Sequence, residues 1–159
     1  MNRPPSFSLK LPRWHEWLIY AISGLLLVTG GAWLLLDRFG KVNGEFGPEP
    51  SPALPWLLLV HGAAAYGFAI AAAMLIPVHM RLGWNSGRNR RSGLLLVGIS
   101  LFLVLGGLAL YYSTAEGFRA AASLSHWVVG LAMPALIVIH LVRGKKSRPG
   151  GAGTKSHTR

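Results

Sequence analysis

The sequence predicts an all-α integral membrane protein, a four-helix up-down bundle with both termini in the cytoplasm. The first observation is composition: more than half of the 159 residues are apolar and only 13% are charged. The second is four apolar stretches, each about as long as the ~20 residues that a helix needs to cross the hydrocarbon of a bilayer. The third is the placement of Lys, Arg, Trp and Tyr at the ends of these stretches.

The four predicted spans are separated by polar or Pro- and Gly-rich segments. They cover about residues 17–36, 54 or 56 to 78, 93–112 and 120–142, with connections at 39–55, 81–92 and 113–119. Pro77 and Pro134 are expected to kink the second and fourth spans. We therefore expect one transmembrane domain over residues 1–142. The tail, residues 143–159, is rich in Gly, Ser, Lys and Arg and is expected to be disordered.

The positions of the positive charges predict the orientation. Thirteen of the sixteen Lys and Arg residues lie in the N-terminal segment, the second connection and the tail, so the positive-inside rule predicts cytoplasmic termini. The net charge of +11 is then a topology signal with a weaker role in binding anionic lipid, and nucleic acid is not an expected partner. The expected location is the bacterial inner membrane, crossed several times. Cysteine is absent, which excludes disulfides, iron–sulfur ligation and covalent haem attachment.

Five of the six histidines lie in or at the ends of predicted spans. His126 and His140 are fourteen residues apart, just under four helical turns, so both leave one helix face about 21 Å apart along its axis. Ionisable side chains at such a depth are costly and point to a functional site. His61 lies at the depth of His126, counted from the outer ends of their helices. His15 and His79 lie at the inner boundary, near the level of His140.

These depths predict two sites for haem b, each with one neutral imidazole on either side of the macrocycle. The outer pair is His61 with His126. The inner ligand His140 has two possible partners, His15 and His79, and the depths alone leave this choice open. Iron is favoured over zinc because the spans offer no Cys and no acidic ligand, and because the fourteen-residue spacing separates two sites.

Glycines accompany the histidines, as a close approach of a macrocycle or a backbone requires. Gly62 directly follows His61, and Gly130 lies four residues, about one helical turn, after His126. Two glycine pairs are expected at the level of the outer histidines, Gly30-Gly31 and Gly106-Gly107.

The same residues resemble the cytochrome b subunits of membrane-bound formate dehydrogenases and nickel–iron hydrogenases, a family of four-helix, two-haem membrane bundles. The first helix of this family opens with a His next to a Trp and later carries a small residue before a Gly. The fourth helix carries His-x3-Gly-x9-His. The matching residues here, within a resemblance that covers about residues 12–145, are Trp14-His15-Glu16-Trp17, Thr29-Gly30, His61, and His126, Gly130 and His140.

The resemblance implies that His61 and His126 hold the outer haem and that His15 and His140 hold the inner one. On the motif we favour His15, although Glu16 interrupts the family's His-Trp pair. The alternative is His79, which follows His61 by eighteen residues, five helical turns, and so lies on the same face. The second and fourth spans would then supply both ligands of both haems, as in the cytochromes b of quinol-oxidising bc complexes.

Two haems at these levels would carry electrons across most of a hydrocarbon core of about 30 Å. The sequence thus predicts a non-catalytic electron-transfer subunit that connects a periplasmic dehydrogenase, reductase or cytochrome with the quinone pool. The resemblance implies a quinone site near the inner haem, with Asn85, Asn89, Arg81 and Arg88 as polar candidates. The competing interpretation is a small non-redox membrane protein, a proton-relaying transporter or an assembly or anchor subunit.

Overall fold

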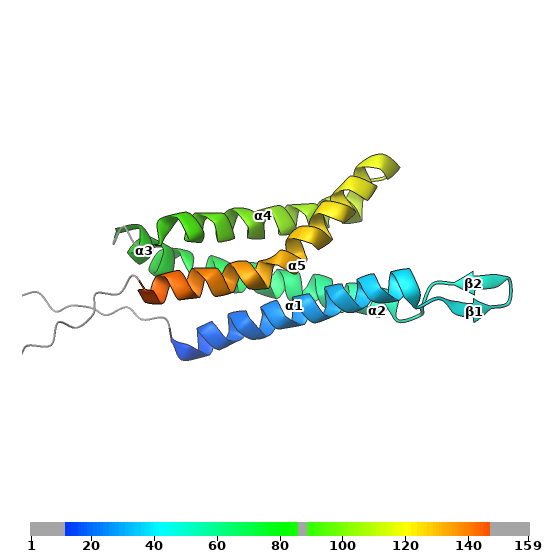
Figure 1. The fold of residues 1–159 in the computed structure, drawn as a ribbon, viewed down its shortest axis with the longest axis horizontal. Helices are drawn as coiled ribbons and strands as arrows, with labels where there is room; N and C mark the ends of the chain where they lie inside the picture. The colour runs from blue at the N-terminus through cyan, green and yellow to red at the C-terminus, as the bar shows by residue number, and fades with distance from the viewer. Residues whose placement is uncertain (1–11, 86–88, 147–159) are drawn as a thin grey trace, which may run out of the picture.

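The computed structural model describes residues 12–85 and 89–146, and over these ranges the chain forms four long helices with short elements between them (Figure 1). The prediction of an all-α protein is confirmed except for two three-residue strands. In chain order the elements are α1 (Arg13–Phe39), β1 (Val42–Gly44), β2 (Gly47–Glu49), α2 (Leu54–Ala73), the π-helix η1 (Ile76–Met80), α3 (Arg81–Asn85), α4 (Arg90–Tyr112) and α5 (Glu116–Lys146).

Four helices are long and apolar enough to cross a membrane: α1, α2, α4, and α5 as far as Gly144. Within the described ranges, the buried apolar residues are only Leu54, Ala64 and Ala71, whereas most of the large apolar side chains are exposed. A soluble monomer rarely exposes contiguous apolar surface on this scale. The architecture is therefore that of a multi-pass membrane protein.

The four long helices run alternately in opposite directions, so α1 begins and α5 ends at the same end of the bundle (Figure 1). We term this the α3 end, and the opposite end, where β1 and β2 project, the strand end. Helix α1 packs mainly against α2, and α4 packs mainly against α5, with fewer contacts between these two pairs. We therefore describe the molecule as a first half, α1 with α2 and the η1 that follows it in the chain, and a second half, α4 with α5.

The connection predicted as a loop between the first two spans contains a β-hairpin. Strands β1 and β2 pair antiparallel, with Val42 opposite Glu49 and Gly44 opposite Gly47. Gly47 has a φ of +120°, a conformation that only glycine adopts without strain. Strands this short show no alternation of apolar and polar residues, so the sequence pattern does not predict them.

The second span differs from its prediction in a way that affects the site. It was expected to be one helix as far as residue 78, but α2 ends at Ala73 and the chain continues as η1. Pro77 has no N–H to donate, and its ring would collide with the carbonyl of the preceding turn of an α-helix. The Met80 N–H instead donates to the carbonyl of Leu75 at 3.2 Å, the i+5 spacing of a π-helix.

The last helix is longer than predicted at both ends. Part of the expected connection at 113–119 and the start of the expected tail, 143–146, belong to α5. Pro134 lies inside this helix without ending it. The rest of the predicted tail, residues 147–159, lies outside the described residues.

Candidate cofactor site: two histidine pairs

Four histidines form two pairs between the halves of the molecule. The ring centroids of His61 in α2 and His126 in α5 are 6.3 Å apart, with 67° between the ring planes. The ring centroids of His79 in η1 and His140 in α5 are also 6.3 Å apart, with 65° between the planes. We term these the strand-end pair and the α3-end pair. Each half of the molecule contributes one imidazole to each pair.

The pairing expected between His15 and His140 is not formed. His15, in the first turn of α1, is 4% exposed and stacks on Trp14 with 5.2 Å between ring centroids. Its Nε2 lies 3.0 Å from the carbonyl oxygen of Ala71 and donates a hydrogen bond to it, since a carbonyl only accepts. That nitrogen is thus engaged with the backbone of α2, and the structure brings His79, the alternative from the sequence, to His140.

Thr29 of α1 orients the ring of His61. Its hydroxyl donates to the carbonyl of Leu25 at 2.7 Å and lies 3.0 Å from Nδ1 of His61. A hydroxyl has only one proton to donate. Because Thr29 donates this proton to the Leu25 carbonyl, its oxygen accepts a hydrogen bond from Nδ1–H of His61. The neutral ring then has its lone pair on Nε2, the nitrogen that is available to a metal.

The ring of His140 is oriented in the same way by α4. The Ser92 hydroxyl donates to the side-chain oxygen of Asn89 and lies 3.0 Å from Nδ1 of His140, from which it accepts. The Asn89 amide nitrogen donates to the backbone carbonyl of His140 at 2.9 Å and lies 3.3 Å from the same Nδ1. An Nδ1 that carries its proton cannot accept from the Asn89 amide, so the 3.3 Å contact is not a hydrogen bond, and the lone pair is again on Nε2. Asn89 can take this position because it adopts the left-handed conformation, with φ 55°, which asparagine tolerates.

Close glycine backbones surround the strand-end pair. A Cβ added at Gly30 would lie 3.0 Å from Cε1 of His61, and one at Gly106 would lie 3.3 Å from Nδ1 of His126. This Nδ1 is buried and has no hydrogen-bond partner in the described residues. Gly107 also faces the ring of His126, at 3.7 Å, whereas Gly31 and Gly62 face nothing within 4 Å. Gly130 faces Leu103 at 3.9 Å, so only three of the six glycines named from the sequence face a histidine.

The spacing within each pair fits two imidazoles bound to one metal from opposite sides. Two metal–nitrogen bonds of about 2.0 Å, plus about 1.1 Å from each nitrogen to its ring centroid, place the centroids about 6.2 Å apart. Edge-to-face packing of two rings also reaches this distance. The free Nε2 lone pairs of His61 and His140 are what favour a metal. Each pair offers two ligands, the number that a haem iron takes when the macrocycle supplies four.

No larger metal-binding group accompanies these pairs in the part of the chain that the structure describes, where groups of three or more His, Cys, Asp or Glu side chains suited to a metal ion are absent. His79, in η1, is exposed, whereas the other three paired histidines are half-buried. Of the polar residues expected near the inner site, Asn89 contacts His140, whereas Arg81 and Asn85 are exposed on α3. Arg88 lies outside the described residues.

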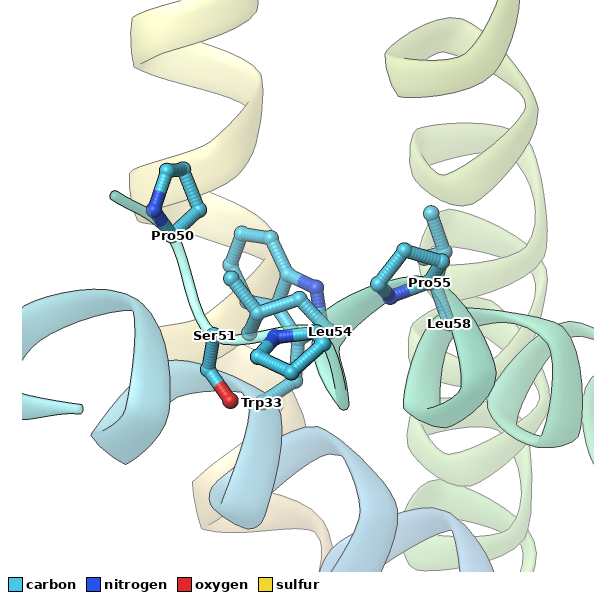
Figure 2. A pocket seen from close by; sticks show the side chains of 7 residues that line it. Trp33, Pro50, Ser51, Leu54, Pro55 and Leu58 are labelled. Carbon is cyan, nitrogen blue, oxygen red and sulfur yellow. The ribbon is translucent and has the colours of Figure 1, made fainter. Parts of the chain in front are cut away.

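A cavity of about 410 Å³ opens at the strand end, between the end of α1 and the start of α2 (Figure 2). Its lining is apolar except for Ser51, whose hydroxyl accepts from the Ala53 N–H at 3.3 Å. Leu58, one turn before His61, forms part of the wall. The lining side chains, which include no charged group, are Trp33, Pro50, Ser51, Pro52, Leu54, Pro55 and Leu58. This cavity suits an apolar or aromatic group.

The sequence indicated the four histidines of the pairs, and it named Thr29 in the motif and Asn89 as a polar candidate, but it did not predict that Thr29, Asn89 and Ser92 orient the rings. Thr29 and Ser92 were detectable as hydroxyls at the helix levels of His61 and His140. Which nitrogen they engage depends on side-chain geometry that spacing does not fix. No family model, no curated protein and no solved structure matches this chain.

Proposed function

We propose that this chain is a multi-pass membrane electron-transfer subunit with two haem b groups, one held by His61 and His126 and the other by His79 and His140. The observation that carries the proposal is the matched geometry of the two pairs, 6.3 Å between ring centroids in each. When bound, a haem with two imidazole ligands exchanges one electron and keeps no open position for a substrate.

The contribution of the protein is to present neutral imidazoles with Nε2 free. Thr29 and Ser92 hold the proton on Nδ1 of His61 and His140, which also increases the basicity of the ligating nitrogen. Gly30 and Gly106 let the neighbouring helices lie against the rings. The proposed ligands come from the long helices α2 and α5 and from η1, which contains Pro77.

The direction of the proposed electron path follows α5, since His126 and His140 are separated by about 21 Å along its axis. This covers most of a hydrocarbon core of about 30 Å. We place the α3 end in the cytoplasm of a bacterium, because the positive charges concentrate in the segments at this end. The strand end would then meet a periplasmic dehydrogenase, reductase or cytochrome, and the membrane quinone pool would exchange electrons at the α3 end. The resemblance to the cytochrome b subunits of formate dehydrogenases and nickel–iron hydrogenases supports this arrangement.

The proposal is tested on the full chain expressed with a haem supply and purified in detergent. We expect a reduced-minus-oxidised spectrum of b-type haem and two haems per chain by extraction. Absence of this spectrum from well-folded protein would contradict the proposal and leave the non-redox interpretation, in which the rings pack edge to face.

The ligand assignment is tested with two matched variants. His79→Ala should lower the content to one haem per chain, because His140 loses its opposite ligand. His15→Gln should keep two, because the Gln amide can still donate to the Ala71 carbonyl that the Nε2 of His15 bonds. The reverse result would assign the ligand role to His15, as the family motif implies.

A further inference from the structure

A second cavity, of about 380 Å³, opens at the α3 end between the start of α4 and the last turns of α5. It is lined by Asn89, Arg90, Arg91, Ser92 and Arg143, so three of its five lining residues are arginines. It is separate from the space between the paired imidazoles. It borders His140 only through Asn89 and Ser92, which lie 3.3 and 3.0 Å from the Nδ1 of this ring.

The positive charge in this cavity is not neutralised by the described chain. Arg91 and Arg143 form no ion pair or hydrogen bond with described residues, and no carboxylate lines the cavity. Arg90 is held in place, because its Nε donates to the Trp84 carbonyl at 2.8 Å and its guanidinium lies 5.1 Å from the centroid of the Trp84 ring. Like charges gathered in one cavity repel, and an anion bound there would relieve this repulsion.

The acidic residues of the described chain lie elsewhere. Four belong to the strand end or to the helix termini next to it: Asp37, Glu45, Glu49 and Glu116. Glu16 is in the first turn of α1. An anion that binds in this cavity would therefore come from outside the described chain.

The surroundings of the cavity match those of a lipid phosphate. Trp84 is 55% exposed next to it, and Trp favours the level of the lipid headgroups. The apolar surface of α4 begins immediately beyond, with Leu94 and Leu95 each 52% exposed. A ligand with an anionic head and an apolar chain would contact the arginines through its head and these two leucines through its chain. Basic pockets between membrane helices on the positively charged side are a recurrent place for anionic headgroups.

We propose that this cavity binds the phosphate of an anionic membrane phospholipid whose acyl chain lies along α4. Arg91 and Arg143 supply the charge, because a guanidinium can donate two parallel hydrogen bonds to a phosphate. Arg90 supplies a charge already fixed by Trp84. The free N–H groups in the first turn of the long helix α4 add donors on the same side. This site does not depend on bound haem.

The test uses native mass spectrometry of the purified full chain with phosphatidylglycerol and phosphatidylcholine of identical acyl chains. We expect one phosphatidylglycerol to be retained under conditions that strip phosphatidylcholine. The double variant Arg91→Gln/Arg143→Gln should retain roughly tenfold less phosphatidylglycerol, since it loses two charge-assisted contacts. Arg13→Gln, at the same end of the bundle but outside the cavity, is the matched control and should retain as much as the unaltered chain.

Equal retention of the two lipids by the unaltered chain would overturn the proposal, and this comparison needs no variant to fold. So would unchanged retention in the double variant, or an equal loss in Arg13→Gln. Release of phosphatidylglycerol by excess inorganic phosphate would assign the cavity to a free phosphate and overturn the lipid proposal. Haem content measured on the same samples separates this result from the test of electron-transfer function.

Discussion

Thr29 shows how one hydroxyl can set the chemistry of a neighbouring ring. Because its proton goes to the Leu25 carbonyl, it receives the Nδ1–H of His61 and leaves Nε2 with the lone pair. A ligand that donates such a hydrogen bond carries more electron density at Nε2, which favours ferric over ferrous iron. In the proposed haem site, Thr29 would therefore adjust the reduction potential of the iron without binding it.

Thr29→Val should raise the midpoint potential of the strand-end haem. Valine has the shape of threonine but cannot accept the hydrogen bond from Nδ1–H of His61. The loss of a hydrogen bond worth about 1 kcal/mol corresponds to a shift of roughly 40 mV for a one-electron couple. A redox titration in the His79→Ala background, where only this haem would remain, measures the shift. Ser23→Ala is the control, because the Ser23 hydroxyl has no partner in the described structure. A shift equal in both variants would show that the Thr29 bond does not act on the site.

Gly30 and Gly31 form a matched pair for testing close approach. A Cβ at Gly30 would lie 3.0 Å from Cε1 of His61, whereas one at Gly31 would meet nothing within 4 Å. Gly30→Ala should therefore displace the ring and weaken haem retention at the strand end by about 1–3 kcal/mol, the usual range for overpacking. Gly31→Ala should leave haem retention unchanged. Haem per chain after dilution into apomyoglobin measures the difference, and equal retention by the two variants would contradict this role of Gly30.

At the scale of elements, His15 joins the beginning of α1 to the end of α2. Its hydrogen bond reaches the carbonyl of Ala71, two residues before α2 ends and the chain turns into η1. Ala71 is itself only 2% exposed, so this hydrogen bond lies in the most buried part of the described structure. The position of η1, and with it His79, therefore depends on a residue of another helix.

His15→Ala should lower the stability of the protein by about 2–3 kcal/mol, because it removes a buried ring and leaves a carbonyl without its donor. His15→Gln should restore part of this loss, since the Gln amide can donate to the same carbonyl. Thermal unfolding in detergent, followed by circular dichroism, measures both. A fully stable His15→Ala variant would show that the buried bond does not hold α1 to α2.

The element scale also explains which predictions from the sequence succeeded. The four long helices and the level of His61 and His126 could be predicted, because length, hydropathy and depth depend on residue counts. Which of His15 and His79 lies beside His140 could not be predicted, because both are expected at the same depth. It depends on the break at Pro77 and on the direction of the His15 ring, and the favoured motif residue is the one whose nitrogen is engaged elsewhere.

At the scale of the whole molecule, few contacts join the two halves directly, while each histidine pair takes one ring from either half. A cofactor bound to both rings of a pair would therefore connect the halves. Any ligand that binds only the assembled form stabilises it by mass action.

Protein produced without haem should have a looser junction between the halves but intact contacts within them. We expect faster hydrogen–deuterium exchange near His61, His126 and His140, and little change where α1 faces α2 away from the pairs. Mass spectrometry of nanodisc samples with and without haem compares the two. Identical exchange patterns would indicate that the halves are held together without the cofactor.

The division of the ligands between the halves has a consequence for biogenesis. A ribosome completes α1, α2 and η1 before α4 and α5, so until α5 is made the chain offers each proposed haem site a single imidazole. One axial bond would retain a cofactor poorly, so under the proposed function haem loading would follow the synthesis of α5. Two filled sites would then report that the first and last long helices have come together.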